Sequence, residues 1–296
     1  MLRVGTDCSG IEAPIMALKQ LKIPFRHEFS SEIDKHCIES IKANYKPKKI
    51  FGDMKKRKVK DVPDIDLYIC GFPCQPFSMA GERKGTEDTR GTIFYECLKV
   101  IRNKKPNYFI LENVKGLITI DEGNTLKEIL QSLKELKIYN VEWKVLNTKD
   151  YGIPQNRERV FIVGIKKSLK KKFKWPEKKK MELLKKYIDW KDTRKDELTE
   201  RYKKHLEIVN PNSYFINLSF SKYNHPFADK YCPCLVTKNE LLNLKLMRKA
   251  NINEYLTLQG FPHSFKQVVS DNQLKKQIGN SISVNVLKEL FKCIGV

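Results

Sequence analysis

The stretch Leu67-Tyr68-Ile69-Cys70-Gly71-Phe72-Pro73-Cys74-Gln75-Pro76-Phe77-Ser78 joins an apolar run to a turn that carries one cysteine between two prolines. So short an apolar run predicts a buried strand, and the prolines end it and stiffen the backbone that follows. Cys74 is therefore expected at the carboxyl end of a strand, where open α/β sheets bind their ligands. A thiol there suits nucleophilic attack once ionised, although free cysteines are more often small buried residues.

Short apolar strands alternate with helical patterns over residues 2–165. The expected strands are Leu2–Thr6, Phe25–Ser31, Leu67–Cys70, Tyr108–Glu112, Val141–Leu146 and Val160–Ile165, and the expected helices are Ile11–Leu21, Lys35–Asn44, Ile93–Arg102 and Thr125–Leu136. This alternation predicts an α/β fold with a doubly wound, mostly parallel sheet, in which the strand ends meet along one edge.

Beyond this region the sequence becomes lysine-rich, polar and aromatic, which indicates a separate and smaller lobe. We expect a catalytic and cofactor-binding domain over residues 1–165, a smaller lobe over residues 166–268, and a C-terminal segment over residues 269–296. The helical pattern of Gln277–Cys293 predicts that this segment packs back on the first domain.

The charge of the chain indicates a polyanionic partner. Its 57 Lys and Arg residues outnumber 35 Asp and Glu residues, which gives a net charge of +22. Codon bias in an AT-rich genome would also favour lysine, but Lys166–Lys186 concentrates eleven lysines against two glutamates. We interpret that run as a phosphate-facing surface, part of which is solvated loop.

The cysteines and histidines form no metal-ligand or disulfide pattern. The eight cysteines are scattered and the five histidines match no ligand spacing, so we expect neither metal nor disulfides. The sequence shows no signal peptide and no run of about 18 apolar residues. We therefore expect a soluble intracellular protein, cytoplasmic in a bacterium, or at the nucleus or a viral replication site if the source is eukaryotic or viral.

The first expected strand runs into Thr6-Asp7-Cys8-Ser9-Gly10-Ile11-Glu12-Ala13. This small-residue turn lets a ligand approach the backbone, but one glycine does not make a dinucleotide motif. Glu32 follows the next strand, where an acid commonly binds ribose hydroxyls, and Asp34 is equally suited to cap a helix. Asp53 and Met54 follow a third apolar piece. Together these residues predict a nucleoside-bearing cofactor without phosphates.

Two further segments place charged groups at the same expected edge. Glu112 ends the strand Tyr108–Glu112, where a carboxylate can protonate or hydrogen-bond a heterocycle. Arg157 and Arg159 precede the last strand, and strand alternation predicts that both lie on one face, suited to an electron-rich base or a phosphate. The alternative for this pair is a surface ion-pair set with Glu158.

In this order, the motifs resemble those of the cytosine-5 DNA methyltransferase family. The matching pieces are Asp7–Ala13, Glu32, Asp53, Phe72-Pro73-Cys74-Gln75, Glu112-Asn113-Val114, Gln155-x-Arg157-x-Arg159, Leu258-Gln259-Gly260-Phe261-Pro262 and Gln277-Ile278-Gly279-Asn280-Ser281. They span nearly the whole chain outside the lysine-rich lobe, and the ordered set is far more specific than any single motif.

This resemblance implies a Rossmann-like methyltransferase fold, S-adenosylmethionine as the methyl donor and a flipped cytosine as the acceptor. It makes Cys74 the nucleophile that adds to carbon 6 of the base, and Glu112 the partner of ring nitrogen N3 and the amino group. Arg159 would hold the carbonyl oxygen, with Arg157 supporting the loop and the intermediate. The segment Gln75–Gly91 would close over the base.

The resemblance also implies a cofactor site, with Glu32 on the ribose, Asp53 on the adenine amino group and Ile93 beside the adenine. The full expected set is Asp7, Cys8, Ser9, Gly10, Ile11, Glu32, Ile33, Asp53, Met54, Phe72, Pro73, Ile93, Asn280, Ser281 and Ile282. The first loop departs from the family pattern, because Cys8 stands where phenylalanine is usual and Glu12-Ala13 where glycines are favoured. Adenine stacking is therefore expected to be built differently.

The lysine-rich lobe falls where the family carries its target-recognition domain, which implies double-stranded DNA with a short recognition site and a restriction-modification setting. The residues expected to contact DNA are Gln75, Ser78, Tyr214, Asn217, Ser219, Lys222 and Tyr223. We expect a monomer. One alternative is a tRNA cytosine-5 methyltransferase, although the Cys-Phe-Thr motif typical of that branch is missing. Another is a catalytically inactive DNA-binding regulator, although Cys74, Glu112 and Arg159 are all in place.

Overall fold

The computed structural model describes residues 1–74, 93–197, 212–218, 227–228, 230–238 and 240–296, with the single positions 200, 203, 206 and 210. These residues form two compact units. The larger unit comprises residues 1–146, 158–176 and 287–296, and the smaller unit comprises residues 147–157 and 177–286. None of the helices in the described residues is long and apolar enough to cross a membrane.

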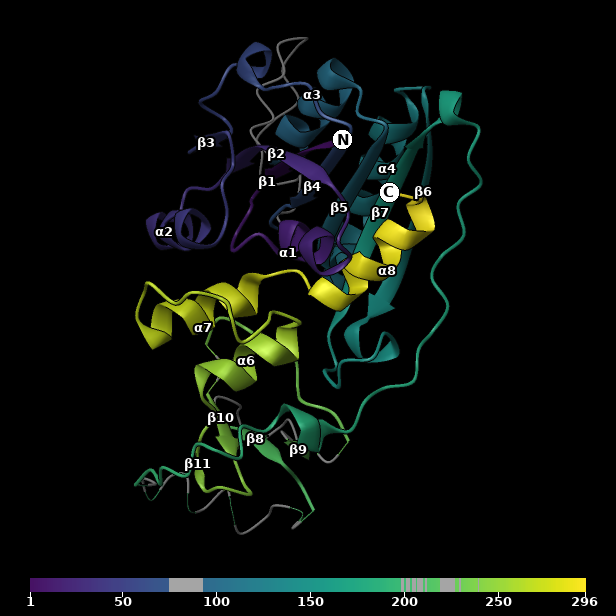
Figure 1. The fold of residues 1–296 in the computed structure, drawn as a ribbon. Helices are drawn as coiled ribbons and strands as arrows, with labels where there is room; N and C mark the ends of the chain where they lie inside the picture. The colour runs from purple at the N-terminus through teal and green to yellow at the C-terminus, as the bar shows by residue number, and fades with distance from the viewer. Residues whose placement is uncertain are drawn as a thin grey trace. The chain divides into compact units, whose positions relative to one another are not determined.

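The larger unit is built on a seven-stranded sheet with the order β3-β2-β1-β4-β5-β7-β6. Its strands are β1 (Leu2–Asp7), β2 (Phe25–Ser31), β3 (Lys49–Phe51), β4 (Leu67–Gly71), β5 (Tyr108–Val114), β6 (Tyr139–Asn147) and β7 (Glu158–Lys166). The five strands from β3 to β5 pair in parallel, and β7 runs antiparallel to β5. This mostly parallel sheet confirms the predicted α/β class (Figure 1).

The strand order reverses between β1 and β4, the two central parallel strands. In open α/β sheets, such a reversal opens a crevice outside the carboxyl ends of the strands, because the connections leave toward opposite faces. The loop after β1 and the turn after β4 both start at this point. The fold thus brings the predicted cofactor loop and Cys74 to neighbouring strand ends.

Most predicted elements are confirmed with bounds shifted by one or two residues. The helices are α1 (Ala13–Gln20), α2 (Lys35–Asn44), α3 (Ile93–Lys104), α4 (Asn124–Lys134), α6 (Ile252–Gln259), α7 (Asp271–Asn280) and α8 (Val284–Ile294). Asp34 caps α2, since its carboxylate accepts a hydrogen bond from the His36 amide at 2.9 Å.

The helical pattern predicted over Gln277–Cys293 is divided between two helices, because α7 ends at Asn280 and α8 begins at Val284. Ser281 has extended backbone angles (φ −71°, ψ 151°). Its carbonyl accepts hydrogen bonds from Arg157 Nη2 at 2.7 Å and Gln259 Nε2 at 2.6 Å. These side chains bind the carbonyl in place of a helical amide, so the helix stops there.

The compact units do not follow the domain boundaries expected from the sequence. Residues 147–157 join the smaller unit, where Asn285 Nδ2 donates to the carbonyls of Thr148 at 3.0 Å and Tyr151 at 2.9 Å. The lysine-rich run is divided after Pro176, and in the larger unit Lys171 Nζ donates to the Gly295 carbonyl at 3.0 Å. The run therefore does not belong wholly to one unit.

The smaller unit contains a four-stranded sheet with the order β11-β10-β8-β9. Its strands are β8 (Phe215–Asn217), β9 (Phe227–Ala228), β10 (Leu241–Asn243) and β11 (Arg248–Lys249). Arg248 and Glu254, on β11 and α6, are both buried and form a double hydrogen bond at 2.9 and 3.0 Å. Arg248 also donates to the Asp189 and Asp192 carbonyls, so it ties the small sheet to the preceding segment.

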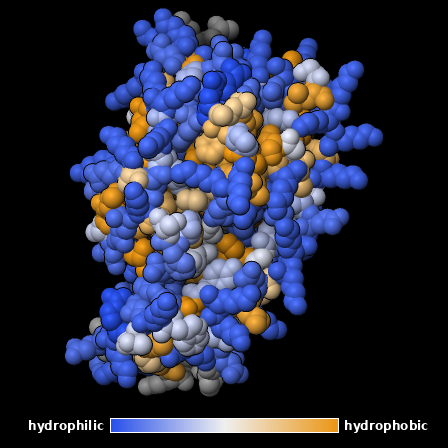
Figure 2. All heavy atoms as spheres, viewed as in Figure 1, coloured by the Kyte–Doolittle hydropathy of each residue, from blue (hydrophilic) through white to orange (hydrophobic). Residues whose placement is uncertain are grey.

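Hydrophilic side chains cover much of the face shown in Figure 2, with hydrophobic patches between them. The interior of the larger unit is packed with aromatic and aliphatic side chains along the sheet. Phe109 on β5 packs against Tyr139 with ring centroids 5.0 Å apart. It also lies directly over Gly164 on β7, where a Cβ atom would stand 2.0 Å from the ring. Only glycine fits at this position.

We expect Gly164→Ala to lower the free energy of unfolding by about 1–3 kcal/mol, because the added methyl group must displace a buried ring. Chemical denaturation measures this. Gly116→Ala is the control, since its Cβ would meet nothing closer than 3.9 Å, and it should change stability by less than about 0.5 kcal/mol. Equal effects of the two substitutions would contradict the packing argument.

Candidate active site

The predicted nucleophile and the predicted acid lie on neighbouring parallel strands. Gly71, the last residue of β4, is paired in register with Glu112 on β5. Cys74 follows Gly71 by three residues and is partly exposed. Both groups therefore belong to the carboxyl edge of the sheet, as the sequence predicted.

The turn that carries Cys74 is anchored from β5. Asn113 Nδ2 donates to the Phe72 carbonyl at 2.9 Å, and Asn113 is only 3% exposed. The Phe72 ring packs on Phe94 with centroids 5.8 Å apart. Asn113 belongs to the motif Glu112-Asn113-Val114, which predicted no role for its side chain. Its amide holds the chain two residues before the thiol.

Burial raises the pKa of the Cys74 thiol above its ordinary value. At neutral pH the free protein therefore carries Cys74 mainly as the thiol, which is a poor nucleophile. Attack by this residue needs an additional influence that stabilises the thiolate or removes its proton.

Glu112 and Arg159 form an ion pair at the same edge. Arg159 Nε lies 3.3 Å from Glu112 Oε1, and both side chains are largely buried. Glu112 is opposite Phe161 in the β5–β7 register, and Arg159 lies two residues away on the same face. Arg159 Nη1 donates in addition to the Glu158 carbonyl at 2.8 Å. The pair presents a carboxylate and a guanidinium side by side, which suits neighbouring polar atoms of one planar ring.

Arg157 does not share this face, so the prediction that alternation pairs it with Arg159 is wrong. β7 begins at Glu158, and Arg157 belongs to the smaller unit with 2% of its surface exposed. Its guanidinium donates to the carbonyls of Leu235 at 2.6 Å, Gly279 at 3.1 Å and Ser281 at 2.7 Å. Within the smaller unit, these bonds hold together segments that are distant in the sequence.

The loop after β1 has an open position beside an acid. Gly10 has φ +53°, and a Cβ there would meet no atom within 4 Å. Its N–H donates to Glu32 Oε2 at 2.8 Å, while Glu32 Oε1 accepts from the amides of Ile33 at 2.8 Å and Asp34 at 3.0 Å. Ile33 is 77% exposed. An oriented carboxylate, open space and an exposed apolar side chain together suit a ribose with an attached base.

Three other predicted cofactor residues point into the protein. Asp7 is 1% exposed and its carboxylate binds the Arg57 guanidinium and, at 2.6 Å, the Tyr68 hydroxyl. Ile11 and Met54 are also buried. Their expected part in a cofactor site stays a prediction. The pairing of Arg57 with Asp7 was not predicted, because Arg57 stands in a lysine-rich stretch without a motif.

The remaining predicted cofactor residues differ in their surroundings. Cys8 and Ile93 are partly buried, Ser9 is buried, Pro73 is exposed, and Asp53 accepts a hydrogen bond from the Lys55 amide at 2.9 Å. Asn280, Ser281 and Ile282 belong to the smaller unit. The expected part of these three residues in a cofactor site stays a prediction.

The structure describes only two of the residues expected to read DNA. Tyr214 is partly buried, with Lys245 Nζ 5.3 Å from its ring centroid. Asn217 is 2% exposed on β8, so its side chain cannot reach a base edge, and the prediction for it is contradicted. Five others lie outside the described residues, namely Gln75, Ser78, Ser219, Lys222 and Tyr223. The whole of the expected closing segment Gln75–Gly91 also lies outside them.

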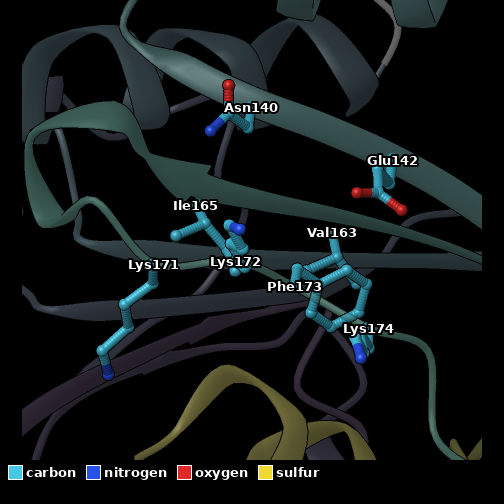
Figure 3. A pocket seen from close by; sticks show the side chains of 8 residues that line it. All are labelled: Asn140, Glu142, Val163, Ile165, Lys171, Lys172, Phe173 and Lys174. Atoms are coloured by element: carbon cyan, nitrogen blue, oxygen red, sulfur yellow. The ribbon is translucent and has the colours of Figure 1, made fainter.

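A pocket of about 340 Å³ lies elsewhere in the larger unit (Figure 3). It is lined by Asn140, Glu142, Val163, Ile165, Lys171, Lys172, Phe173 and Lys174. Ile165 is six residues beyond Arg159 on β7, about 20 Å along the strand, so this pocket is separate from the Glu112–Arg159 pair. The lysine nitrogens in Figure 3 point in different directions and do not converge on one anion.

Across the residues that the structure describes, there is no group of three or more His, Cys, Asp or Glu side chains that could hold a metal ion.

Comparisons with known proteins identify a family that the chain resembles over most of its length. A family model described as C-5 cytosine-specific DNA methylase matches residues 7–295. The chain is 37% identical to the type II methyltransferase M.NgoBI of Neisseria gonorrhoeae over 276 residues, which cover 89% of this chain and 84% of that protein. It is 40% identical to the type II methyltransferase M1.ScrFI of Lactococcus lactis subsp. cremoris, covering 86% and 68%.

A solved structure of similar fold is the Dnmt2 methyltransferase of S. pombe, with a TM-score of 0.71, 20% identity, and coverage of 100% of this chain and 99% of that one. At this identity the likeness concerns the fold. The family model and the curated relatives go further, because they match most of the sequence. The chain therefore belongs to the C-5 cytosine-specific DNA methylase family.

Proposed function

We propose that the protein transfers a methyl group from S-adenosylmethionine to carbon 5 of a cytosine flipped out of duplex DNA. The observation that carries this proposal is the grouping of Cys74, Glu112 and Arg159 at adjoining strand ends of the larger unit. A cytosine inside a duplex hides its ring face, so the base must be extruded at a cost of a few kcal/mol.

In this mechanism the chain activates the ring before the methyl group arrives. The Cys74 thiolate adds to carbon 6, while Glu112, as the protonated acid, donates its proton to N3 and accepts a hydrogen bond from the amino group. Arg159 holds the carbonyl oxygen. The addition makes carbon 5 nucleophilic. Bound S-adenosylmethionine supplies an electrophilic methyl group on a positively charged sulfur. Carbon 5 would form a bond to this methyl group, and the sulfur would keep the electron pair of the broken sulfur–methyl bond. Transfer of the carbon 5 proton to a base would then return the electron pair that expels Cys74 as thiolate.

The Glu112–Arg159 contact supports this assignment because it orients both groups before substrate binds. Their 3.3 Å separation allows contacts with neighbouring edge atoms of one pyrimidine. Fixed donors and acceptors in a largely buried site stabilise developing charge without reorganisation. Asn113 also holds the turn that carries Cys74, because its side-chain amide donates to the Phe72 carbonyl.

The residues at the β1 loop fit the nucleoside part of S-adenosylmethionine. Glu32 keeps acceptor capacity for ribose hydroxyls, since a carboxylate offers about four lone-pair sites. The open position at Gly10 admits close approach, and Ile33 offers apolar surface to an adenine ring. In this proposal, Asp53 binds the adenine amino group and Ile93 lies beside the ring.

Duplex DNA is the proposed polymer because the relatives M.NgoBI and M1.ScrFI are named type II methyltransferases. The net charge of +22 is consistent with a polyanionic substrate. A role alongside a restriction enzyme belongs to the same proposal.

Duplex DNA containing 5-fluorocytosine tests the reaction. Fluorine cannot leave as a proton does, so with S-adenosylmethionine the wild-type protein should become covalently attached to DNA. Cys74→Ser should abolish the attachment, measured as a shifted band on a denaturing gel. Cys293→Ser is the matched control, because Cys293 is also partly exposed in the larger unit and should trap normally.

Trapping on fluorinated tRNA but not on DNA would replace DNA by RNA as the substrate. No attachment to either polymer would contradict catalysis and favour a DNA-binding regulator.

The raised pKa of Cys74 gives a second expected outcome. In the free protein, its alkylation by iodoacetamide should accelerate about tenfold per pH unit from pH 7 upward, because the thiolate fraction grows until the pH passes the raised pKa. Mass spectrometry of the Cys74 peptide measures the rate, with the Cys293 peptide as an internal reference. A plateau below about pH 8 would contradict the assigned direction.

A further inference from the structure

A fully buried carboxylate, Glu12, lies beneath the loop that joins β1 to α1. Its side chain is 0% exposed, and its φ of 59° lies in the left-handed region. That conformation strains a residue with a Cβ, and burial removes a carboxylate from water. Backbone strain and the burial of a charge thus both destabilise the fold at Glu12, although Glu12 touches no reacting group in the proposed mechanism.

Polar contacts converge on one oxygen of this carboxylate. Glu12 Oε1 accepts hydrogen bonds from Thr6 Oγ1 at 2.6 Å and Ser30 Oγ at 2.5 Å. A basic side chain also lies beside this oxygen, since His27 Nε2 is 3.3 Å from Glu12 Oε1. Burial and then the charge of Glu12 raise the pKa of Tyr45, which packs nearby on the α2 side.

From Glu12 the contacts lead to the open loop. Thr6 Oγ1 is 2.8 Å from Ser9 Oγ, which accepts a hydrogen bond from the Ser31 amide at 3.0 Å. The Ser9 amide donates back to the Ser31 carbonyl at 3.0 Å. The next residue, Gly10, donates its N–H to Glu32 at 2.8 Å. Glu12 is therefore linked through two hydroxyl groups to the backbone next to Gly10.

The other buried carboxylate beneath this loop has a different role. Asp7 is paired with the permanently charged Arg57 and with Tyr68. Tyr68 lies on β4, and Arg57 also donates to Ser31 Oγ on β2. Asp7 thus reaches Ser9 through the Arg57 guanidinium and Ser31, whereas Glu12 reaches it more directly, through the Thr6 hydroxyl.

We propose that Glu12 is a positioning residue for the cofactor, and that its carboxylate fixes the Ser9–Gly10 loop so that Gly10 and Glu32 are oriented before S-adenosylmethionine binds. This inference rests on the proposed function, which places the nucleoside of the cofactor at Glu32. A loop that is already ordered loses less conformational entropy on binding, so affinity is higher.

Calorimetric titration of S-adenosylmethionine into Glu12→Ala, Glu12→Gln and Thr6→Val tests this. Glu12→Ala keeps the backbone strain and removes the acceptor, so the dissociation constant for S-adenosylmethionine should rise about tenfold. Glu12→Gln retains one acceptor oxygen, so its dissociation constant should rise less. Thr6→Val leaves Glu12 intact but breaks its link to Ser9. The double variant Thr6→Val with Glu12→Ala should bind no more weakly than Glu12→Ala, because both act through one chain of bonds.

Glu28→Ala is the matched control, since Glu28 is the residue next to His27 on β2, is 5% exposed, and pairs with Lys48 at 2.9 Å. It should lower thermal stability without changing cofactor affinity. Amide hydrogen exchange of the ligand-free proteins provides a readout independent of ligand. Exchange at Ser9 and Gly10 should be faster in Glu12→Ala and Thr6→Val than in Glu28→Ala.

Unchanged affinity for S-adenosylmethionine in both Glu12→Ala and Thr6→Val would overturn the proposal. Amide exchange at Ser9 and Gly10 that is no faster in these two variants than in Glu28→Ala would also overturn it. If Glu12→Ala fails to fold, Thr6→Val and Glu12→Gln decide the question. Failure of the wild-type protein to bind S-adenosylmethionine would be a different result, because it would contradict the proposed function and remove the basis of this inference.

Discussion

The candidate active site depends on the register of β4 between its two parallel neighbours. β4 pairs with β1 through Asp7 and Cys70, and with β5 through Gly71 and Glu112. These two pairings fix where three loops leave the sheet, and each loop carries different chemistry. A slip of one residue in β4 would turn its side chains to the opposite faces and move Cys74 relative to Glu112. The core that buries β4 on both faces therefore also sets the geometry of the reacting groups.

Much of the larger unit was predictable from the sequence because its rules are local. Apolar runs such as Leu67–Cys70 predict buried strands, and parallel strands share one edge, so Cys74 and Glu112 could be placed together. The same reasoning failed at Arg157, because it extended strand alternation to a residue that precedes the strand. It could not find Glu12 either, since a buried acid in a left-handed conformation runs against residue preferences.

The division of the chain could not be predicted for a different reason. Composition changes near Lys166, but the units exchange segments at positions where composition does not change, such as Asn147 and Glu158. Long-range hydrogen bonds decide those boundaries, for example from Asn285 to Thr148 and Tyr151. Partners more than a hundred residues apart leave no trace in local periodicity. Asn217 shows the same limit, since only the folded sheet reveals that its side chain is buried.

The contacts of Arg157 have a consequence for how the smaller unit can change during evolution. Its guanidinium donates to three backbone carbonyls, at Leu235, Gly279 and Ser281. Every amino acid has a carbonyl, so this attachment does not depend on which side chains the partner segments carry. A substitution at Leu235 or Ser281 keeps the carbonyl, whereas position 279 requires glycine, because a Cβ there would stand 2.5 Å from the backbone of Val236. The smaller unit can therefore vary at Leu235 and Ser281 while these backbone contacts are retained.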